Sequence, residues 1–325
     1  MVAMVVAALL AAALAQAYVQ QVTLPKRGLE NRATAAGMPR YAVIAHRGAS
    51  YLAPEETAPA YLLARDMGAD YLEADIQRTK DGVLIAFHSQ AVGETTNAAQ
   101  VFPGREKDPV DAFTLAELKR LDAGTWFNAA HPRQARSAYA GVKILTLDEL
   151  LTIAGSGSQQ PALYLETKSP ERFPGVERDL VGLLRQRGWL EQRAASGHAK
   201  VVFQSFRPES LARLRELVPD VPRVRLFGSR LFDRAAWNAM TREVTGTDQG
   251  IGPTAYLCWP WNVATAHRAG LLIHPYTVNE IWQFRILAFL GAGDGFFTDR
   301  CDNLLRFYGR PVLESPERIL ARNGY

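Results

Sequence analysis

Two histidine motifs and a pair of acidic residues lie close together between Val43 and Ser89. They are His46-Arg47-Gly48, Phe87-His88-Ser89 and, between them, Glu73-Ala74-Asp75. Residues two apart in a strand share a face, so Glu73 and Asp75 point the same way. Two carboxylates on one face repel each other unless a cation compensates them, and hard ions such as Ca²⁺ and Mg²⁺ prefer oxygen ligands. The spacing therefore predicts a site for one divalent cation, with two imidazoles nearby in the chain.

Short apolar runs position these residues. Three ranges fit buried strands: Tyr41–Ala45, which ends at His46; Ala69–Ile76, which carries the acids; and Val83–Phe87, which ends at His88. Thr79-Lys80-Asp81-Gly82, between the last two, is a turn signal. The reactive side chains are thus expected at strand ends.

The rest of the chain alternates between expected strands and helices. Further strands are expected over Ala162–Glu166, Lys200–Ser205, Pro222–Phe227, Gly250–Gly252, Leu271–Thr277 and Gly295–Thr298. Helices are expected over Ala60–Met67 (with Thr57 as N-cap and Gly68 as stop), Leu147–Ile153, Val176–Arg187, Pro208–Val218, Val263–Ala269 and Ile281–Leu290. This alternation indicates βα units and a parallel sheet.

The count of about nine strands is one more than an eight-stranded barrel holds. The link from Asp75 to Val83 is too short for a crossover helix. Either one short run is a loop, or this pair of strands lacks its helix.

A long irregular stretch, Gln90 to Val142, follows the third strand. Only Thr114–Leu121 is expected to be helical there, with Thr114 and Glu117 forming a capping box. A loop of this length is typical of a lid or binding loop, and we expect it to shape the mouth of the site. Trp126 and Trp259-Pro260-Trp261 fit a lid surface, or an aromatic patch that contacts lipid or a partner.

The ordered set of motifs resembles the glycerophosphodiester phosphodiesterase family. The motifs are His46-Arg47-Gly48-Ala49, Pro54-Glu55-Glu56-Thr57, Glu73-Ala74-Asp75, Thr79-Lys80-Asp81-Gly82, His88, Leu165-Glu166-Thr167-Lys168, Gln204-Ser205-Phe206, Tyr276-Thr277-Val278-Asn279 and Phe297-Thr298-Asp299. The resemblance spans Tyr41 to Asp302 and implies a TIM-type (β/α)8 barrel, here with a long insertion at about 90–142 after the third strand. Two positions depart from the family pattern, which usually has Asn at Glu56 and Asp at Ser89.

The resemblance implies that Glu73, Asp75 and Glu166 bind the metal. Hydrolysis of a phosphodiester further needs a base to activate water and an acid to protonate the leaving alkoxide. Imidazole titrates near neutral pH, so we assign these tasks to His46 and His88, with their order open.

Cationic and aromatic residues complete the expected site. Arg47 is expected to contact the phosphate, and Lys168 either adds a positive charge there or sets the position of Glu166. Glu55 is a candidate to hydrogen-bond substrate hydroxyls or to orient His46, and Phe206 and Tyr276 are candidates to wall the polyol side. The other histidines, His131, His198, His267 and His274, are expected to be structural.

The chain begins with a targeting signal. Residues 1–17 are apolar and uncharged and end in Ala15-Gln16-Ala17, which predicts a signal peptide, or alternatively a membrane anchor, and export to a periplasm or the medium. A polar leader over 18–40 is expected to be loose or to lie across the outside of the barrel. No linker interrupts 41–325, which we interpret as one domain.

Cys258 and Cys301 either pair in an oxidising compartment or remain thiols.

Charge and composition limit the classes of molecule that the protein is expected to bind. The chain has 325 residues, 48% of them hydrophobic, which suffices for one large core. Its net charge is +4, with no Lys/Arg run or stacking platform of the kind that binds nucleic acid.

We therefore expect an exported hydrolase that converts small glycerophosphodiesters to glycerol 3-phosphate and an alcohol. One alternative is a phospholipase D-like barrel that acts on lysolipids, by hydrolysis or by internal attack, with peripheral contact to a membrane. A second is a phosphodiester-binding protein without turnover, which the changes at Glu56 and Ser89 motivate. A nucleic-acid phosphodiesterase is a more distant alternative.

Overall fold

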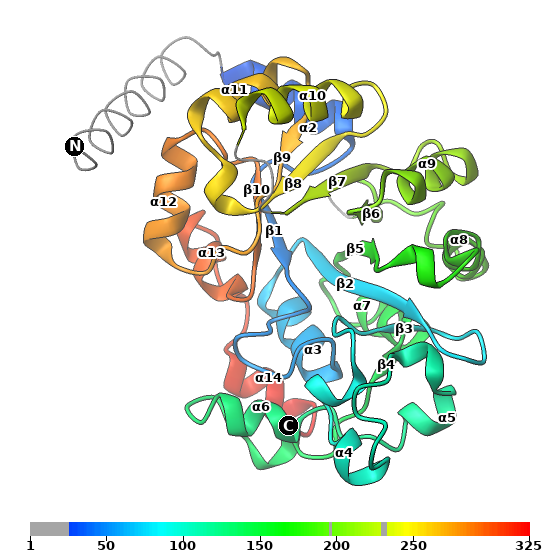
Figure 1. The fold of residues 1–325 in the computed structure, drawn as a ribbon. Helices are drawn as coiled ribbons and strands as arrows, with labels where there is room; N and C mark the ends of the chain where they lie inside the picture. The colour runs from blue at the N-terminus through cyan, green and yellow to red at the C-terminus, as the bar shows by residue number, and fades with distance from the viewer. Residues whose placement is uncertain (1–25, 195–196, 229–232) are drawn as a thin grey trace, which may run out of the picture.

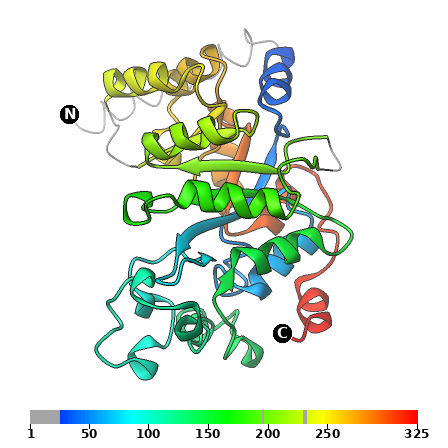
Figure 2. The ribbon, with the colours of Figure 1, turned by 90° about the vertical axis from the view of Figure 1, so that its right-hand side faces the viewer.

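The structure is a computed structural model that describes residues 26–194, 197–228 and 233–325. At its centre lie eight parallel strands in the spatial order β10-β1-β2-β5-β6-β7-β8-β9, with helices around the outside (Figures 1 and 2). They are β1 (Ala42–Ala45), β2 (Tyr71–Arg78), β5 (Ala162–Thr167), β6 (Val201–Ser205), β7 (Arg223–Phe227), β8 (Gly250–Pro253), β9 (Leu272–Ile273) and β10 (Gly295–Thr298).

Hydrogen bonds between β10 and the segment that follows β9 close the sheet into a barrel. The Phe297 N–H donates to the Pro275 carbonyl (3.1 Å), and the Val278 N–H donates to the Phe297 carbonyl (2.9 Å). On its other side β10 pairs with β1 in parallel register from Ala42↔Gly295 to Ala45↔Thr298. The predicted TIM-type barrel is confirmed.

The extra strand of the sequence count lies outside the barrel. β3 (Leu84–Ala86) runs antiparallel to the last residues of β2, from Ile76 to Arg78, and pairs in turn with the two-residue strand β4 (Leu145–Thr146). β2 thus extends past the barrel rim, turns at residues 79–82 and comes back. This hairpin explains why no helix separates Glu73 from His88.

Helices cover the barrel between successive strands. They are α3 (Ala58–Met67), α7 (Leu147–Gly155), α8 (Val176–Gln186), α9 (Pro208–Leu217), α10 (Arg234–Val244), α11 (Pro260–Arg268), α12 (Ile281–Phe289) and α13 (Cys301–Phe307), and α14 (Pro316–Arg322) packs against α3. Three of these, α10, α13 and α14, were not predicted. α3 begins after Thr57 and ends at Gly68 (φ 102°) as expected, but the Thr57 hydroxyl donates to the Pro54 carbonyl instead of capping the helix.

The insertion is a compact unit and not an open loop. Figure 1 shows its short helices α4 (Ala98–Val101) and α5 (Leu115–Leu118) below β3 and β4, and α6 (Thr125–Ala130) on the side toward α14. Phe113, Phe127 and Tyr139 are fully buried in it. The expected helix at Thr114–Leu121 is a single turn, with the predicted capping box of Thr114 and Glu117.

Alternation along the strands divides the barrel interior into two halves. Near the strand starts the inward side chains are apolar, among them Ile44, Tyr71 and Tyr164. Two and four residues further along the same strands, the inward positions are occupied by His46, Glu73, Asp75 and Glu166. The barrel therefore has an apolar base and a polar mouth.

A helix before the barrel closes the apolar base. α2 (Lys26–Ala36) covers part of the predicted polar leader, and Ala33, Ala36 and Met38 pack against the inward-facing residues at the strand starts. The expectation that this segment is loose or lies across the outside is wrong for these residues, because their small and apolar side chains fill the base.

The structure decides the expectation about the cysteines, whereas the targeting segment stays a prediction. Cys258 and Cys301 are buried free thiols, so the alternative of a disulfide is wrong. The predicted targeting segment 1–17 and the first part of the leader lie outside the described residues and stay predictions. Within the described ranges, no helix combines the length and apolarity needed to cross a bilayer.

The base predicts a specific loss of stability. Met38→Ala should lower the free energy of unfolding by about 2–5 kcal/mol, because Met38 is fully buried against the barrel interior. Glu30→Ala on the exposed side of α2 is the matched control, expected to change it by less than about 0.5 kcal/mol. Urea unfolding measures both changes. Equal unfolding curves for Met38→Ala and the unmodified protein would contradict the packing of Met38 against the barrel interior.

Candidate active site

A cleft of about 230 Å³ opens at the C-terminal ends of the barrel strands. All the site residues predicted from the sequence line it except Glu55. Its full lining is His46, Arg47, Glu73, Asp75, His88, Glu166, Lys168, Gln204, Phe206, Leu226, Tyr276, Thr277 and Phe297. No described residue between 90 and 142 lines this cleft, so the insertion does not form its mouth as we expected.

Three buried carboxyl groups form the centre of the cleft. Glu73 and Asp75 project from β2, and the parallel register pairs Asp75 with Glu166 on β5. One oxygen of each residue lies within 4.8 Å of an oxygen of the other two. The predicted acidic group is thus brought together as a set that can hold one metal ion.

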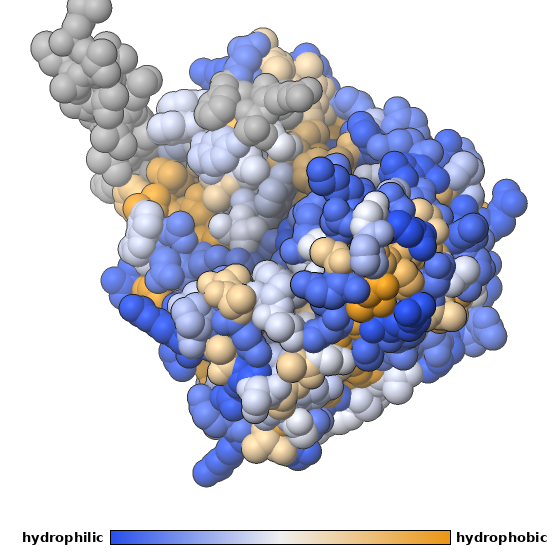
Figure 3. All heavy atoms as spheres, turned by 60° about the horizontal axis from the view of Figure 1, so that its bottom comes forward, coloured by the Kyte–Doolittle hydropathy of each residue, from blue (hydrophilic) through white to orange (hydrophobic). Residues whose placement is uncertain are grey.

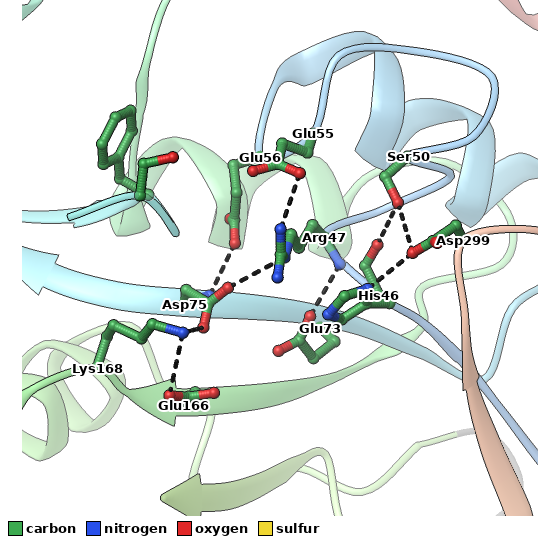
Figure 4. A network of polar contacts seen from close by, with 12 residues as sticks. His46, Arg47, Ser50, Glu55, Glu56, Glu73, Asp75, Glu166, Lys168 and Asp299 are labelled. Atoms are coloured by element: carbon green, nitrogen blue, oxygen red, sulfur yellow. Dashed lines mark hydrogen bonds and ion pairs between the residues drawn. The ribbon is translucent and has the colours of Figure 1, made fainter. Parts of the chain in front are cut away.

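The negative charge of Asp75 is compensated more strongly than those of Glu73 and Glu166. Lys168 Nζ lies 3.2 Å from Asp75 Oδ1, and Arg47 Nε lies 3.4 Å from Oδ2 (Figure 4). Burial disfavours the charged form of Asp75, but Lys168 and Arg47 outweigh it and hold the Asp75 pKa well below its usual range. Lys168 also lies 3.6 Å from Glu166.

Glu73 and Glu166 have fewer cationic side chains near them than Asp75 has. Burial, with the charge of Asp75, raises the pKa of Glu73 to about 7 and raises that of Glu166 well above its usual value. Asp75 Oδ2 and Gln204 Oε1 are buried without a hydrogen-bond partner. An oxygen-lined group with surplus negative charge and unsatisfied acceptors fits a hard divalent cation.

His46 is held at the cleft by a carboxylate. Its Nδ1–H donates to Asp299 Oδ1 (2.7 Å), and Asn279 Nδ2 donates to Asp299 Oδ2 (2.7 Å). Burial and Arg47 lower the His46 pKa, but the hydrogen bond and charge of Asp299 with the charge of Glu73 outweigh them, so the pKa is raised. Burial disfavours the charged form of Asp299, but its own hydrogen bonds, above all the one with His46, hold the Asp299 pKa at about 2.

His88 reaches the cleft through the β2–β3 hairpin. The Phe87 N–H donates to the Asp75 carbonyl (2.9 Å), which places the following residue beside the acids. Gln77 Nε2 donates to the Phe87 and Ser89 carbonyls (2.6 and 3.1 Å) and fixes the backbone on both sides of His88. Burial lowers the His88 pKa to about 3 against the opposing charge of Asp75.

Arg47 adopts an unusual backbone conformation that serves the site. Its φ is 56°, in the left-handed region, and its N–H donates to Glu73 Oε2 (2.8 Å). Arg47 Nη1 donates to Glu55 Oε2 (2.9 Å). Glu55 therefore orients Arg47 from outside the cleft and does not contact His46 in the described contacts.

Three polar residues of the site stand in the quoted motifs, but we assigned them no role there. Asp299 supports His46, and Gln204 Nε2 donates to Glu73 Oε1 (2.8 Å). Glu56 is buried: its Oε1 accepts from the Asp75 N–H (2.9 Å; Figure 4), and its Oε2 accepts from the Tyr61 hydroxyl. Burial and the charge of Asp75 raise the Glu56 pKa well above its usual value.

The aromatic candidates lie together on one side of the cleft. The rings of Phe206 and Tyr276 meet edge to face at 6.1 Å, and the Tyr276 hydroxyl donates to the Phe227 carbonyl (2.7 Å). Away from the cleft, His267 pairs with Asp294, His274 with Tyr164, and His131 packs on Phe127.

Comparisons with known proteins agree with this geometry. A model of the glycerophosphoryl diester phosphodiesterase family matches residues 46–303. The chain belongs to this family. The glycerophosphodiester phosphodiesterase of Bacillus subtilis (strain 168) is 39% identical over 263 residues, which cover 81% of this chain and 85% of that protein. The glycerophosphodiester phosphodiesterase of Caldanaerobacter subterraneus is 30% identical over 264 residues, covering 81% and 96%.

A solved structure supports the fold of this family member. It is an Oleispira antarctica phosphodiesterase in complex with its product sn-glycerol-3-phosphate; the TM-score is 0.67, the identity 24%, and the match covers 83% of this chain and 97% of that one. The protein is a phosphoric diester hydrolase. The predicted glycerophosphodiester phosphodiesterase activity is therefore confirmed as a class of reaction.

The contact between His46 and Asp299 predicts a change in titration. In the metal-free Asp299→Asn variant the His46 pKa should fall, because the Asp299 carboxylate that stabilises the imidazolium is gone. The protonated fraction of His46 at neutral pH should fall with it. NMR titration of the ring resonances measures this, with His267, whose partner is Asp294, as the internal reference. An unchanged His46 titration would contradict the coupling.

Proposed function

We propose that this phosphodiesterase hydrolyses glycerophosphodiesters with one divalent cation and two histidines in acid and base roles. The observation that carries the proposal is the buried group of Glu73, Asp75 and Glu166 between two imidazoles whose pKa values are shifted in opposite directions. Opposite shifts in one cleft are the usual mark of an acid and base pair.

The cation that suits these ligands is Ca²⁺ or Mg²⁺. Glu73, Asp75 and Glu166 would hold it through oxygen atoms, and Gln204 would fix the rotamer of Glu73. When bound, such an ion neutralises charge on the phosphate and lowers the pKa of a bound water.

Two cationic side chains would bind the phosphate beside the metal ligands. Arg47 has five N–H donors, and its contacts with Glu55 and Asp75 leave others for phosphate oxygens. Lys168, between Asp75 and Glu166, adds a second positive charge. Phe206 and Tyr276 would pack against the carbons of the glycerol half.

The environments of the two histidines support a different role for each. His46, which Asp299 favours in its protonated form, would donate a proton to the leaving alkoxide. His88, kept neutral by burial, would accept a proton from the attacking water. Water adds to phosphorus, the bond from phosphorus to the head-group oxygen breaks, and the products are glycerol 3-phosphate and an alcohol.

Metal removal tests the first part of the proposal. Chelation should abolish hydrolysis of glycerophosphocholine, and Ca²⁺ or Mg²⁺ should restore it. Glu73→Gln and Glu166→Gln should raise the cation concentration for half-maximal activity at least about tenfold, since each removes a charged ligand. Glu171→Gln, an exposed acid paired with Arg207, is the matched control. Full activity in protein shown to be metal-free by elemental analysis would refute metal dependence.

A comparison of leaving groups tests the assignment of the histidines. His46→Ala and His88→Ala should each lower kcat/KM for glycerophosphocholine by about 10²–10⁴-fold. A p-nitrophenyl ester of glycerol 3-phosphate releases an anion that needs no proton, so it should restore most of the rate in His46→Ala and little in His88→Ala.

The control for this experiment is His131→Ala, whose ring packs in the insertion. Rescue of His88→Ala and not of His46→Ala would reverse the roles, and rescue of neither would remove the acid from the mechanism.

A further inference from the structure

A second hollow lies at the end of the barrel opposite the catalytic cleft. Its volume is about 450 Å³, and it is formed by the C-terminal part of α7, the loop that follows α8, and Gln160 and Lys200, which precede β5 and β6. Of the side chains that line it, Leu151, Trp189 and Lys200 are buried, whereas Arg187 is exposed. No Asp or Glu occurs among the described residues that line it. We call this space the basal hollow.

Lys200 is a buried charged residue without an acidic partner. The face drawn in Figure 3 is largely hydrophilic, which is usual because charged side chains stay at the surface unless they are paired. Four arginine or lysine residues in the described ranges are buried. Three of them form ion pairs with carboxylates: Arg65, Arg223 and Arg225. Lys200 is the fourth; it is 4% exposed and forms no ion pair with a described residue.

The contacts of Lys200 leave its ammonium group incompletely satisfied. An ammonium group has three hydrogen-bond donors. One donates to the Gln160 carbonyl, and Nζ lies 5.1 Å from the centre of the Trp189 ring, which is a cation–π contact. Neither partner carries a negative charge, and no other described residue accepts a hydrogen bond from Nζ. Burial lowers the Lys200 pKa, and no neighbouring acid opposes this shift.

Arg187 adds a second cationic group at the exposed rim of the basal hollow. Its Nη1 donates to Asp148 Oδ1, and its Nη2 donates to Thr152 Oγ1 (3.2 Å). A guanidinium group has five donors, so others remain in addition to these two. Asp148 does not line the hollow. The described lining therefore presents two cationic groups and no carboxylate to a bound molecule.

The end of α7 does not cancel this positive charge. The last carbonyl groups of a helix carry partial negative charge and disfavour an anion nearby. Arg65 Nη1 donates to the Ile153 carbonyl (3.1 Å) and to Ser156 Oγ (2.7 Å), so a cationic group already lies at this end of the helix. The partial charge of the last turn is thus partly compensated, although Arg65 also pairs with Asp66.

We propose that the basal hollow binds a small molecule through an oxyanion group that accepts hydrogen bonds from Lys200. Phosphate and carboxylate oxygens form strong, charge-assisted hydrogen bonds with lysine and arginine. The volume of the hollow lies within the range of small-molecule sites, about 300–1,000 Å³, so it has room for further atoms next to Leu151 and Trp189. The inference is independent of the proposed function, because the hollow shares no lining residue with the cleft.

The stability of a lysine variant tests whether Lys200 serves a ligand or the fold. Lys200→Met keeps an unbranched side chain and removes the charge. In buffer without oxyanions the variant should unfold at the same urea concentration as the unmodified protein or at a higher one, since an unpaired buried charge is costly. A lysine that only ties the chain to the Gln160 carbonyl and Trp189 predicts a lower midpoint instead.

Calorimetric titration with inorganic phosphate locates the binding site. Phosphate is also expected at the cleft, so Arg47→Gln serves to weaken that component. The component that persists in Arg47→Gln should have its Kd raised at least about tenfold by Lys200→Met, because a hydrogen bond to a charged group is lost. Lys143→Met is the matched control: Lys143 also donates to a backbone carbonyl, that of Leu121 (3.0 Å), but it is exposed and lies outside the hollow.

A second variant keeps the test decisive if Lys200→Met does not fold. Arg187→Gln changes an exposed side chain at the rim and leaves the buried floor intact. It should raise the same Kd about two- to fivefold, as expected for a charge that is partly exposed to solvent. An unchanged Kd in Arg187→Gln, together with an unfolded Lys200→Met, would assign Lys200 to the fold and contradict the proposal.

A comparison of ligands separates the two oxyanion classes. Glycerol 3-phosphate and succinate would be titrated into the Arg47→Gln protein in the same way as inorganic phosphate. Binding of glycerol 3-phosphate without succinate assigns the hollow to phosphate esters, and the reverse assigns it to carboxylates. Either result supports the inference if Lys200→Met weakens the binding.

Three results would overturn the inference. They are the loss of all binding of the three anions in Arg47→Gln, a remaining component that Lys200→Met leaves unchanged, and a lower urea midpoint for Lys200→Met in buffer without oxyanions. None of these measurements depends on turnover of a diester, so failure of the hollow is distinguishable from failure of the proposed function.

Discussion

The site depends on an imbalance of charge at one mouth of the barrel. Four carboxyl groups, those of Glu56, Glu73, Asp75 and Glu166, are buried there, and two permanently cationic side chains, Arg47 and Lys168, face them. The buried carboxyl groups outnumber these two cationic side chains, and Arg47 also pairs with Glu55, so a divalent cation would supply positive charge that the site lacks. Burial and the neighbouring carboxyl groups raise the pKa values of Glu73, Glu166 and Glu56, because burial of unpaired carboxylates is costly.

The barrel accommodates this imbalance because its two ends have different composition. The parallel register of β2 with β5 places Asp75 beside Glu166, and the same alternation fills the base with Ile44, Tyr71 and Tyr164 under α2. The apolar base and the larger apolar core that includes the surrounding helices both bury hydrophobic side chains away from the charged mouth.

Much of the site could be predicted from local rules, and what was missed has identifiable causes. The period of two in a strand was enough to place Glu73 with Asp75, and strand ends were enough to find His46, His88 and Glu166. The same rule applied to Lys200–Ser205 would have found Gln204, which pairs in register with Glu166. Asp299 and the buried position of Glu56 depend on contacts between distant segments, which periodicity does not reveal. The β2–β3 hairpin was ambiguous because strand direction is not encoded in an apolar run, and α10 was missed although Trp237, Met240, Thr241 and Val244 follow helical spacing.

The most direct test of the charge balance is the effect of cations on stability. Urea unfolding of the metal-free protein should be shifted to higher urea by Ca²⁺ or Mg²⁺, with a gain of about 2.7 kcal/mol at a free concentration one hundred times the dissociation constant. In Asp75→Asn the gain should be lost. An unfolding midpoint that millimolar Ca²⁺ and Mg²⁺ both leave unchanged would contradict the account, because the buried carboxyl groups would then be balanced without a metal ion.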